Sequence, residues 1–135
     1  MNRKDSSVEL EDNSDILNDV ITVFLEKLPK RLLIIEEQVK ALATEDWDIG
    51  AAKDVMITLH SLAGTGITFG FIELGHCASA IESQIKKAVI GGLSDQDRSS
   101  LIDMTSNLIS YGESAKTNLP EHSLTFGSVR AEPLG

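Results

Sequence analysis

The stretch 15-DILNDVITVFLEKLPKRLLIIEEQVKALA-43 decides the fold of this 135-residue chain. Its apolar residues recur at steps of three and four, which is the period of a helix with one buried stripe. Pro29 lies inside the pattern and removes one backbone donor, so we expect a kink or a break there. The predicted buried stripe consists of Leu17, Val20 or Ile21, Phe24, Leu28, Leu32, Ile35, Val39 and Leu42.

Three further stretches repeat the helical period, from about 47 to 70, from 71 to 89, and from 95 to the region before 119. Asp46 is the expected N-cap of the second helix and Ser94 that of the fourth, where Asp95 and Asp97 face the positive end of the dipole. Gly70 and the pair 91–92 are expected to end the second and third helices. The predicted core positions are Ala51, Val55, Leu59, Leu62 and Gly66, then Leu74, Ala78, Ile81, Ile85 and Ala88 or Val89, and finally Leu101, Thr105, Leu108, Gly112 and Ala115.

Four amphipathic helices with short connections predict an all-α fold, an antiparallel up-down-up-down four-helix bundle. The bundle is expected over residues 14–118. Residues 1–13 are polar and charged, and we interpret them as a flexible or covering N-terminal segment. Residues 119–135 are rich in Ser, Gly and Pro, which predicts a disordered tail.

Composition and charge exclude several classes of function. Twenty-one acidic residues against 12 basic ones give a net charge of -9, which repels nucleic acid and anionic membranes. The single cysteine excludes an internal disulfide and suits a reducing compartment. No signal peptide and no bilayer-spanning apolar run are visible. We therefore expect a soluble cytoplasmic monomer, and the Met1 start favours a stand-alone protein over a piece of a larger sensor.

His60 is predicted to lie on the exposed face of the second helix. With Val55 as the centre of the buried stripe and about 100° per residue, Leu59, Leu62 and Gly66 fall within roughly 40° of that centre. His60 falls about 140° away from it. The pattern therefore predicts an imidazole that faces away from the core.

The face around His60 is unusual for a solvated helix surface. Gly64 lies one turn further on, although glycine inside a helix costs about 1 kcal/mol relative to alanine. Packing within a monomer does not explain an outward glycine, so we interpret it as room for another protein or for a bulky group on the imidazole. Lys53 shares this face, and exposed isoleucines on it are typical of a docking surface. The predicted docking residues are Ile57, Ser61 and Ile67.

An exposed imidazole suits phosphoryl chemistry. Imidazole is a nucleophile at neutral pH, and a phosphorylated imidazole can hand its group on when the acceptor assists. No set of metal-ligating residues accompanies His60, so we expect no metal and no cofactor, and any magnesium would come with the partner. No glycine-rich nucleotide-binding motif is present, so we expect a phosphoryl carrier and not a kinase.

The stretch around His60 resembles the signature of the histidine-containing phosphotransfer (Hpt) domain family. In that signature a phosphorylated His is followed by Leu at +2, Gly at +4 and a second Gly at +10, which here are Leu62, Gly64 and Gly70. The segments 24–32 and 46–47 also resemble the family, and the likeness covers roughly residues 14–118. The resemblance implies that His60 accepts a phosphoryl group from a receiver-domain aspartate or a hybrid sensor histidine kinase and passes it on to a receiver.

One position departs from the family pattern. Many members carry Lys at +3, where its charge can help hold the phosphoryl group or the receiver, and this chain has Ala63. Lys53, two turns earlier on the same face, is one candidate for the missing charge. The pair Lys86 and Lys87 is another if the third helix packs alongside.

Two alternatives stay open from the residues. A receiver-binding module could keep the docking face without transferring phosphate, since Ala63 replaces the usual Lys. An enzyme with His60 as general base is disfavoured, because no Asp, Glu or Cys lies on its helix face. Among the other candidates, we interpret His76 as a packing residue, Cys77 as a small core or boundary residue, and His122 as a tail residue without a role.

Overall fold

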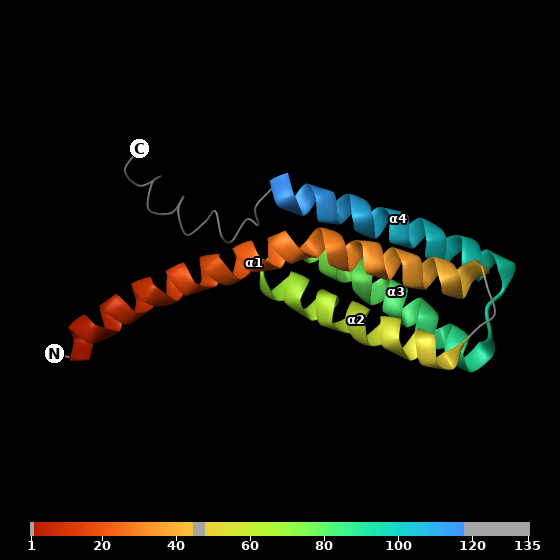
Figure 1. The fold of residues 1–135 in the computed structure, drawn as a ribbon. Helices are drawn as coiled ribbons and strands as arrows, with labels where there is room; N and C mark the ends of the chain where they lie inside the picture. The colour runs from red at the N-terminus through yellow and green to blue at the C-terminus, as the bar shows by residue number, and fades with distance from the viewer. Residues whose placement is uncertain (1, 45–47, 118–135) are drawn as a thin grey trace.

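The computed structural model describes residues 2–44 and 48–117, and all regular structure in them is helical (Figure 1). Successive helices run in opposite directions, α1 packs against α4 and α2, and α3 packs against α2 and α4. The predicted four-helix bundle is confirmed. None of the described helices combines the length and apolar character needed to span a bilayer. The helices are α1 Asn2–Thr44, α2 Ile49–Thr68, α3 Ile72–Gly91 and α4 Asp95–Thr117.

The predicted apolar stripes form the core, with small adjustments. On α1 the stripe is buried from Ile21 to Leu42, whereas Val20 is exposed. On α2 the first core position is Ala52, so the prediction of Ala51 is wrong. The reason is that α2 makes its most extensive contact with α3, which rotates the buried stripe toward the flank that carries Ala52 and Ala63.

α1 is longer than predicted, because it begins at Asn2 and not near Asp15. Residues 2–14 contain neither Gly nor Pro, so nothing in the sequence stops the helix there, and this extension projects beyond the bundle (Figure 1). Pro29 does not break α1, which continues through it to Thr44. Burial of Leu28 and Leu32 on either side of the proline offsets the lost backbone hydrogen bond.

The N-caps differ in how well they were predicted. Asp48 caps α2, with its Oδ1 accepting from the Gly50 N–H at 3.0 Å, so the prediction of Asp46 as the cap is wrong. Residues 45–47 lie outside the described part of the chain. Ser94 caps α4 as predicted, because the Asp97 N–H donates to Ser94 Oγ and the Ser94 N–H to Asp97 Oδ2, both at 3.1 Å. The bond from the Ser94 backbone lowers the pKa of the Asp97 carboxyl.

The turn between α2 and α3 is closed by Gly70, as predicted. Its φ of 92° is the left-handed conformation that favours glycine. The Gly70 N–H donates to the Ile67 carbonyl at 3.1 Å and the Phe71 N–H to the Gly66 carbonyl at 2.7 Å, the hydrogen-bond pattern of a Schellman motif. The motif satisfies two terminal carbonyls of α2 and reverses the chain into α3.

Two glycines let α2 and α3 approach closely beyond this turn. A Cβ on Gly66 would lie 3.4 Å from the Gly75 Cα, and a Cβ on Gly75 would lie 2.9 Å from the Ala63 carbonyl oxygen. Only glycine at position 75 avoids that contact with backbone. The close approach sets the register of the α2–α3 pair, and therefore which α3 side chain lies opposite His60.

Candidate functional site

His60 lies on α2 with its side chain 80% exposed. The neighbouring residues Leu59 and Leu62 are fully buried in the core. The helical period therefore places the imidazole on the far side of the helix, as predicted from the sequence.

Glu82 of α3 holds one ring nitrogen of His60. Its Oε2 and Oε1 lie 3.1 Å and 3.3 Å from His60 Nδ1. An ionised carboxylate only accepts hydrogen bonds, so Nδ1 carries the proton in this contact. In the neutral ring Nε2 is then unprotonated, with a free lone pair and no partner among the described residues.

Sequence reasoning missed Glu82. The absence of Asp, Glu and Cys from the helix face of His60 says nothing about neighbouring helices, and the carboxylate that reaches the imidazole comes from α3. The contact joins residues 22 positions apart on two helices. The glycines at 66, 70 and 75 could have indicated the contact from the sequence. A tight turn at Gly70, with closely packed glycines on either side, brings position 60 of α2 opposite position 82 of α3.

A shallow hollow beside His60 is lined by residues of α2 and its C-terminal turn. Gly64 forms part of it, and a Cβ at this position would meet nothing within 4 Å, which confirms the predicted outward glycine. Ser61, the predicted docking residue, lines it as well. Thr65, Thr68 and Phe69 also line the hollow and were not predicted as site residues. The lining residues are His60, Ser61, Gly64, Thr65, Thr68 and Phe69.

The other predicted site residues lie outside this hollow. Lys53 is exposed about 10 Å from His60 along the axis of α2. Ile57 is 69% exposed, while the side chain of Ile67 lies against Gly75 of α3. Ala63, at the position of the family lysine, is 7% exposed and packs toward α3. Lys86 and Lys87 are both exposed on α3.

His76 and Cys77 line a separate shallow hollow between α3 and α4, together with Tyr111. His76 is exposed, so its interpretation as a packing residue is wrong. Cys77 is partly buried, its Sγ donates to the Met104 carbonyl at 3.4 Å, and burial raises the pKa of the thiol. The thiol form is therefore favoured, and Cys77 is a boundary residue and not an activated nucleophile. His122 lies outside the described residues.

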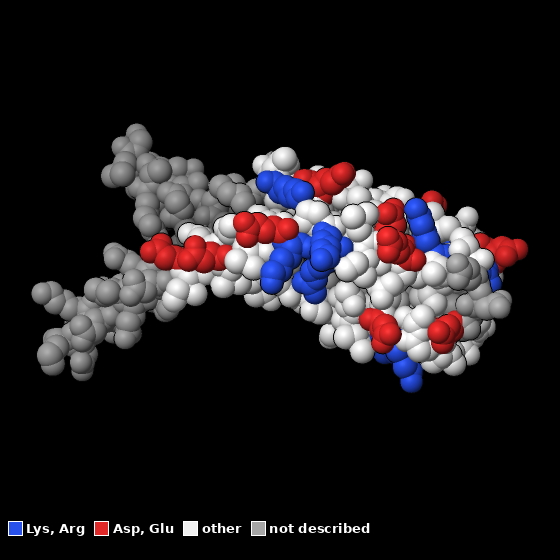
Figure 2. Space-filling model, in the orientation of Figure 1, with Lys and Arg blue, Asp and Glu red and all other residues white. Residues whose placement is uncertain are grey.

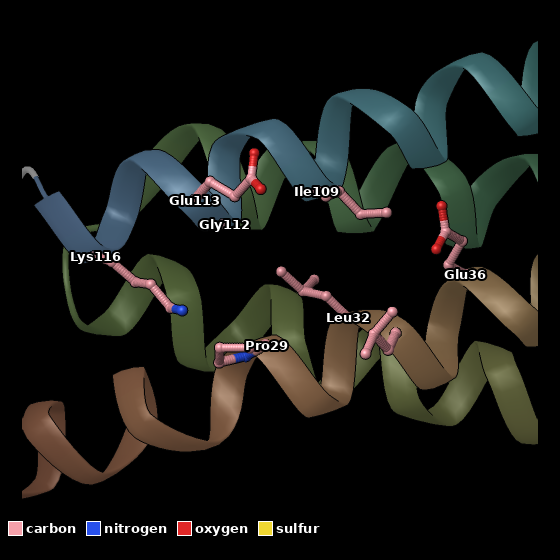
Figure 3. A pocket seen from close by; sticks show the side chains of 8 residues that line it. Pro29, Leu32, Glu36, Ile109, Gly112, Glu113 and Lys116 are labelled. Atoms are coloured by element: carbon pink, nitrogen blue, oxygen red, sulfur yellow. The ribbon is translucent and has the colours of Figure 1, made fainter.

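A groove of about 260 Å³ lies between α1 and α4, where side chains of the two helices face each other (Figure 3). Gly112 leaves room in the groove for Leu32, because a Cβ at position 112 would overlap the Cδ1 atom of Leu32. The groove offers carboxylates and an ammonium group but no imidazole or thiol. Its lining consists of Pro29, Leu32, Leu33, Glu36, Ile109, Gly112, Glu113 and Lys116. Across the described residues, no group of three or more His, Cys, Asp or Glu side chains is placed to hold a metal ion.

Comparison with protein families matches residues 19–110 to the Hpt domain. The matched range is more than half of the chain and contains all of α2 and α3, with His60, Glu82 and the hollow beside His60. Comparisons with curated proteins and with solved structures give no match.

Proposed function

Because this chain belongs to the Hpt domain family, whose members carry phosphoryl groups in two-component phosphorelays, we propose that His60 is the residue that accepts and donates the phosphoryl group. Domains of this family are carriers and not kinases, and they work with receiver domains and sensor kinases. The observation that supports the assignment best is the 80% exposed imidazole whose Nδ1 is held by Glu82.

The proposed transfer is a direct displacement at phosphorus. The Nε2 lone pair attacks the phosphorus of a receiver aspartyl phosphate, the Nε2–P bond forms, and the P–O bond to the aspartate breaks with its electron pair leaving on the carboxylate. The ring keeps its Nδ1 proton throughout and gains positive charge, which the Glu82 carboxylate balances. The reverse sequence returns the group to a second receiver.

The proposed docking face surrounds the hollow. Gly64 leaves space in front of the imidazole, and Ser61 lies beside it. Ile57 and Ile67 offer exposed apolar area on the same helix, with Lys53 further along. A receiver that approaches along this face brings its own magnesium ion, and the protein acts as a monomer within the transfer complex.

A phosphotransfer assay tests this proposal. The protein is mixed with a receiver domain phosphorylated on its aspartate with ³²P, and the label on each chain is followed with time. We expect the label to move to this protein, to be lost in acid and to survive in alkali, as a phosphorylated imidazole requires. Nitrogen-15 NMR of the labelled ring should place the phosphorus on Nε2. Transfer of no label, or label stable to acid, would contradict the proposal.

A receiver-binding module without transfer is the second candidate function, and Ala63 in place of the family lysine favours it. This module would bind a receiver, but phosphate would stay on the aspartate in the same assay. The two functions are therefore separated by whether the label moves while the two proteins still bind each other.

Glu82→Gln is expected to slow phosphoryl uptake without changing the fold. Gln still accepts a hydrogen bond from Nδ1 but no longer balances the positive charge that develops on the ring. Because His60 is mostly exposed, water screens this charge, and we expect the initial rate to fall about threefold to tenfold. Glu73→Gln removes an exposed carboxylate of α3 that does not contact His60, and it serves as the control. Equal rates for both variants would show that the carboxylate has no part in transfer.

A further inference from the structure

The alanine at position 63 leaves a phosphoryl group on His60 without the positive charge that the family pattern supplies. Ala63 is 7% exposed and packs toward α3. A phosphoryl group carries negative charge and three oxygens that accept hydrogen bonds. Figure 2 shows basic side chains gathered over the middle of α1, but the helix that reaches the imidazole is α3, through Glu82. α3 is therefore the neighbouring helix whose charges lie nearest the ring.

The two adjacent lysines of α3 lie on different flanks of the helix. Gln84 donates to Asp97 of α4 at 3.0 Å, which marks the flank that faces α4. The pKa of the Asp97 carboxyl is lowered chiefly by the Ser94 backbone hydrogen bond and further by the charge of Lys87, so Lys87 also faces α4. Lys86 is rotated by about 160° from Gln84 and is therefore on the side of α3 away from α4.

Lys86 and His60 lie on the same outer surface of the α2–α3 pair. Around α2, Ala63 faces Gly75 of α3, and His60 is rotated by about 60° more from the core. Around α3, Glu82 reaches toward α2, and Lys86 is rotated by about 40° more from the core. Both side chains are exposed. Each of them therefore lies just outside the line of contact between the two helices, on its solvent side.

The two side chains also lean toward each other along the helix axes. Lys86 follows Glu82 by one turn, about 6 Å along α3. Side chains on a helix tilt toward its N-terminus, and α2 and α3 run in opposite directions. Lys86 therefore leans back toward the level of Glu82, and His60 leans toward the level of Lys86. The flexible four-carbon stem of the lysine covers the rise that remains.

Lys53, the candidate cation on α2, leans away from the imidazole. It precedes His60 by seven residues, which places it about 10 Å nearer the N-terminus of the same helix. Because side chains tilt toward that end, its ammonium group is directed further from the ring. The tertiary structure therefore favours Lys86 over Lys53 as the source of the charge.

The ammonium group of Lys86 is available for a ligand. The ion pairs among the described residues are Lys40–Glu36, His60–Glu82 and Arg98–Asp95, and none of them includes Lys86. We propose that Lys86 binds the phosphoryl group on Nε2 of His60, donating from its ammonium group to the phosphoryl oxygens. In this arrangement Glu82 holds the Nδ1 side of the ring while Lys86 neutralises charge on the phosphoryl group. This inference rests on the proposed function of His60 and deepens it.

The phosphoryl equilibrium between a receiver and this protein tests the role of Lys86. The receiver is labelled with ³²P and chosen so that its aspartyl phosphate hydrolyses slowly compared with transfer. We expect Lys86→Gln to lower the equilibrium constant for transfer to His60 about twofold to fivefold, the range of an exposed ion pair. The loss should shrink as the salt concentration rises, because salt screens exposed charges.

This constant distinguishes phosphate binding from docking. It depends only on the free proteins with and without phosphate, so a lysine that merely helps the receiver dock would change the transfer rate and not the constant. Lys87→Gln removes the adjacent charge on the α4 flank and is the matched control, and Lys53→Gln removes the charge on α2. Both should leave the constant nearly unchanged. Lys86→Arg keeps the positive charge and should retain the wild-type constant.

The outcomes separate the inference from the function. If Lys86→Gln keeps the wild-type constant, the phosphate-binding role is wrong while His60 remains the carrier. An equal loss in Lys87→Gln or Lys53→Gln would show that net charge and not the position of Lys86 matters, and would also overturn the inference. So would a loss in Lys86→Arg as large as that in Lys86→Gln. If the wild-type protein takes up no label, the proposed function fails and the inference fails with it.

Discussion

Replacement of His60 by Gln is expected to abolish phosphoryl uptake altogether, with loss of more than about a hundredfold in initial rate. The amide side chain has similar size and polarity but no nitrogen lone pair that can attack phosphorus. The assay measures acid-labile ³²P transferred from a phosphorylated receiver. Because the proposal makes His60 the only acceptor, no label above the assay background should appear on the variant, and the receiver should lose its label only by its own hydrolysis.

The fold should not change in this variant. His60 is mostly exposed, and its hydrogen bonds in the described part of the chain go to Glu82 alone. An exposed ion pair of this kind contributes between about 0 and 1 kcal/mol to stability, so its removal lowers the free energy of unfolding by no more than that. Urea unfolding should therefore give nearly the same midpoint for the variant and the wild type.

His76→Gln is the matched control, because His76 is another exposed histidine on the same bundle. It should take up phosphate at the wild-type rate. Acid-labile label on the His60→Gln protein would show that the carrier was assigned to the wrong residue. The same conclusion would follow if the His76→Gln protein failed to take up label while the His60→Gln protein still did.

Gly64→Leu is expected to stabilise the bundle and at the same time to block transfer. A side chain at position 64 meets nothing in the protein, and replacing a helical glycine by leucine favours the helix by up to about 1 kcal/mol. The same side chain fills the space over the hollow, where the receiver and the phosphoryl group must approach. We expect the transfer rate to fall at least about tenfold, which corresponds to a 1.4 kcal/mol increase in the barrier.

Gly91→Leu provides the matched control for this variant. Gly91 is also helical, and a Cβ there meets nothing within 4 Å, but it lies at the far end of α3 from the hollow. It should leave transfer unchanged. The measurements are the urea midpoint and the initial transfer rate of both variants.

The result for Gly64→Leu is informative because stability and transfer change in opposite directions. A general loss of structure would lower both. Unchanged transfer in the Gly64→Leu protein would mean that partners do not approach across this glycine, and the docking face around Ser61, Ile57 and Ile67 would have to be placed elsewhere.

The amino-acid sequence by itself determined the helices, the core stripes and the outward direction of His60. These features depend on the period of one helix at a time, so the spacing from Leu59 to Gly66 was sufficient to place the imidazole. Features at the ends of helices were less certain. α1 begins at Asn2 and Asp48 caps α2, because several polar residues near each boundary could serve equally well.

Only the tertiary structure decided which groups surround the imidazole. Ala52 replaces Ala51 in the core because α2 turns its stripe toward α3, a choice that no single helix contains. Glu82 reaches His60 because the turn at Gly70 and the close approach of Gly66 to Gly75 set the register of two helices. That register is a property of the packed pair, and so the partner of the exposed histidine could be identified only after folding.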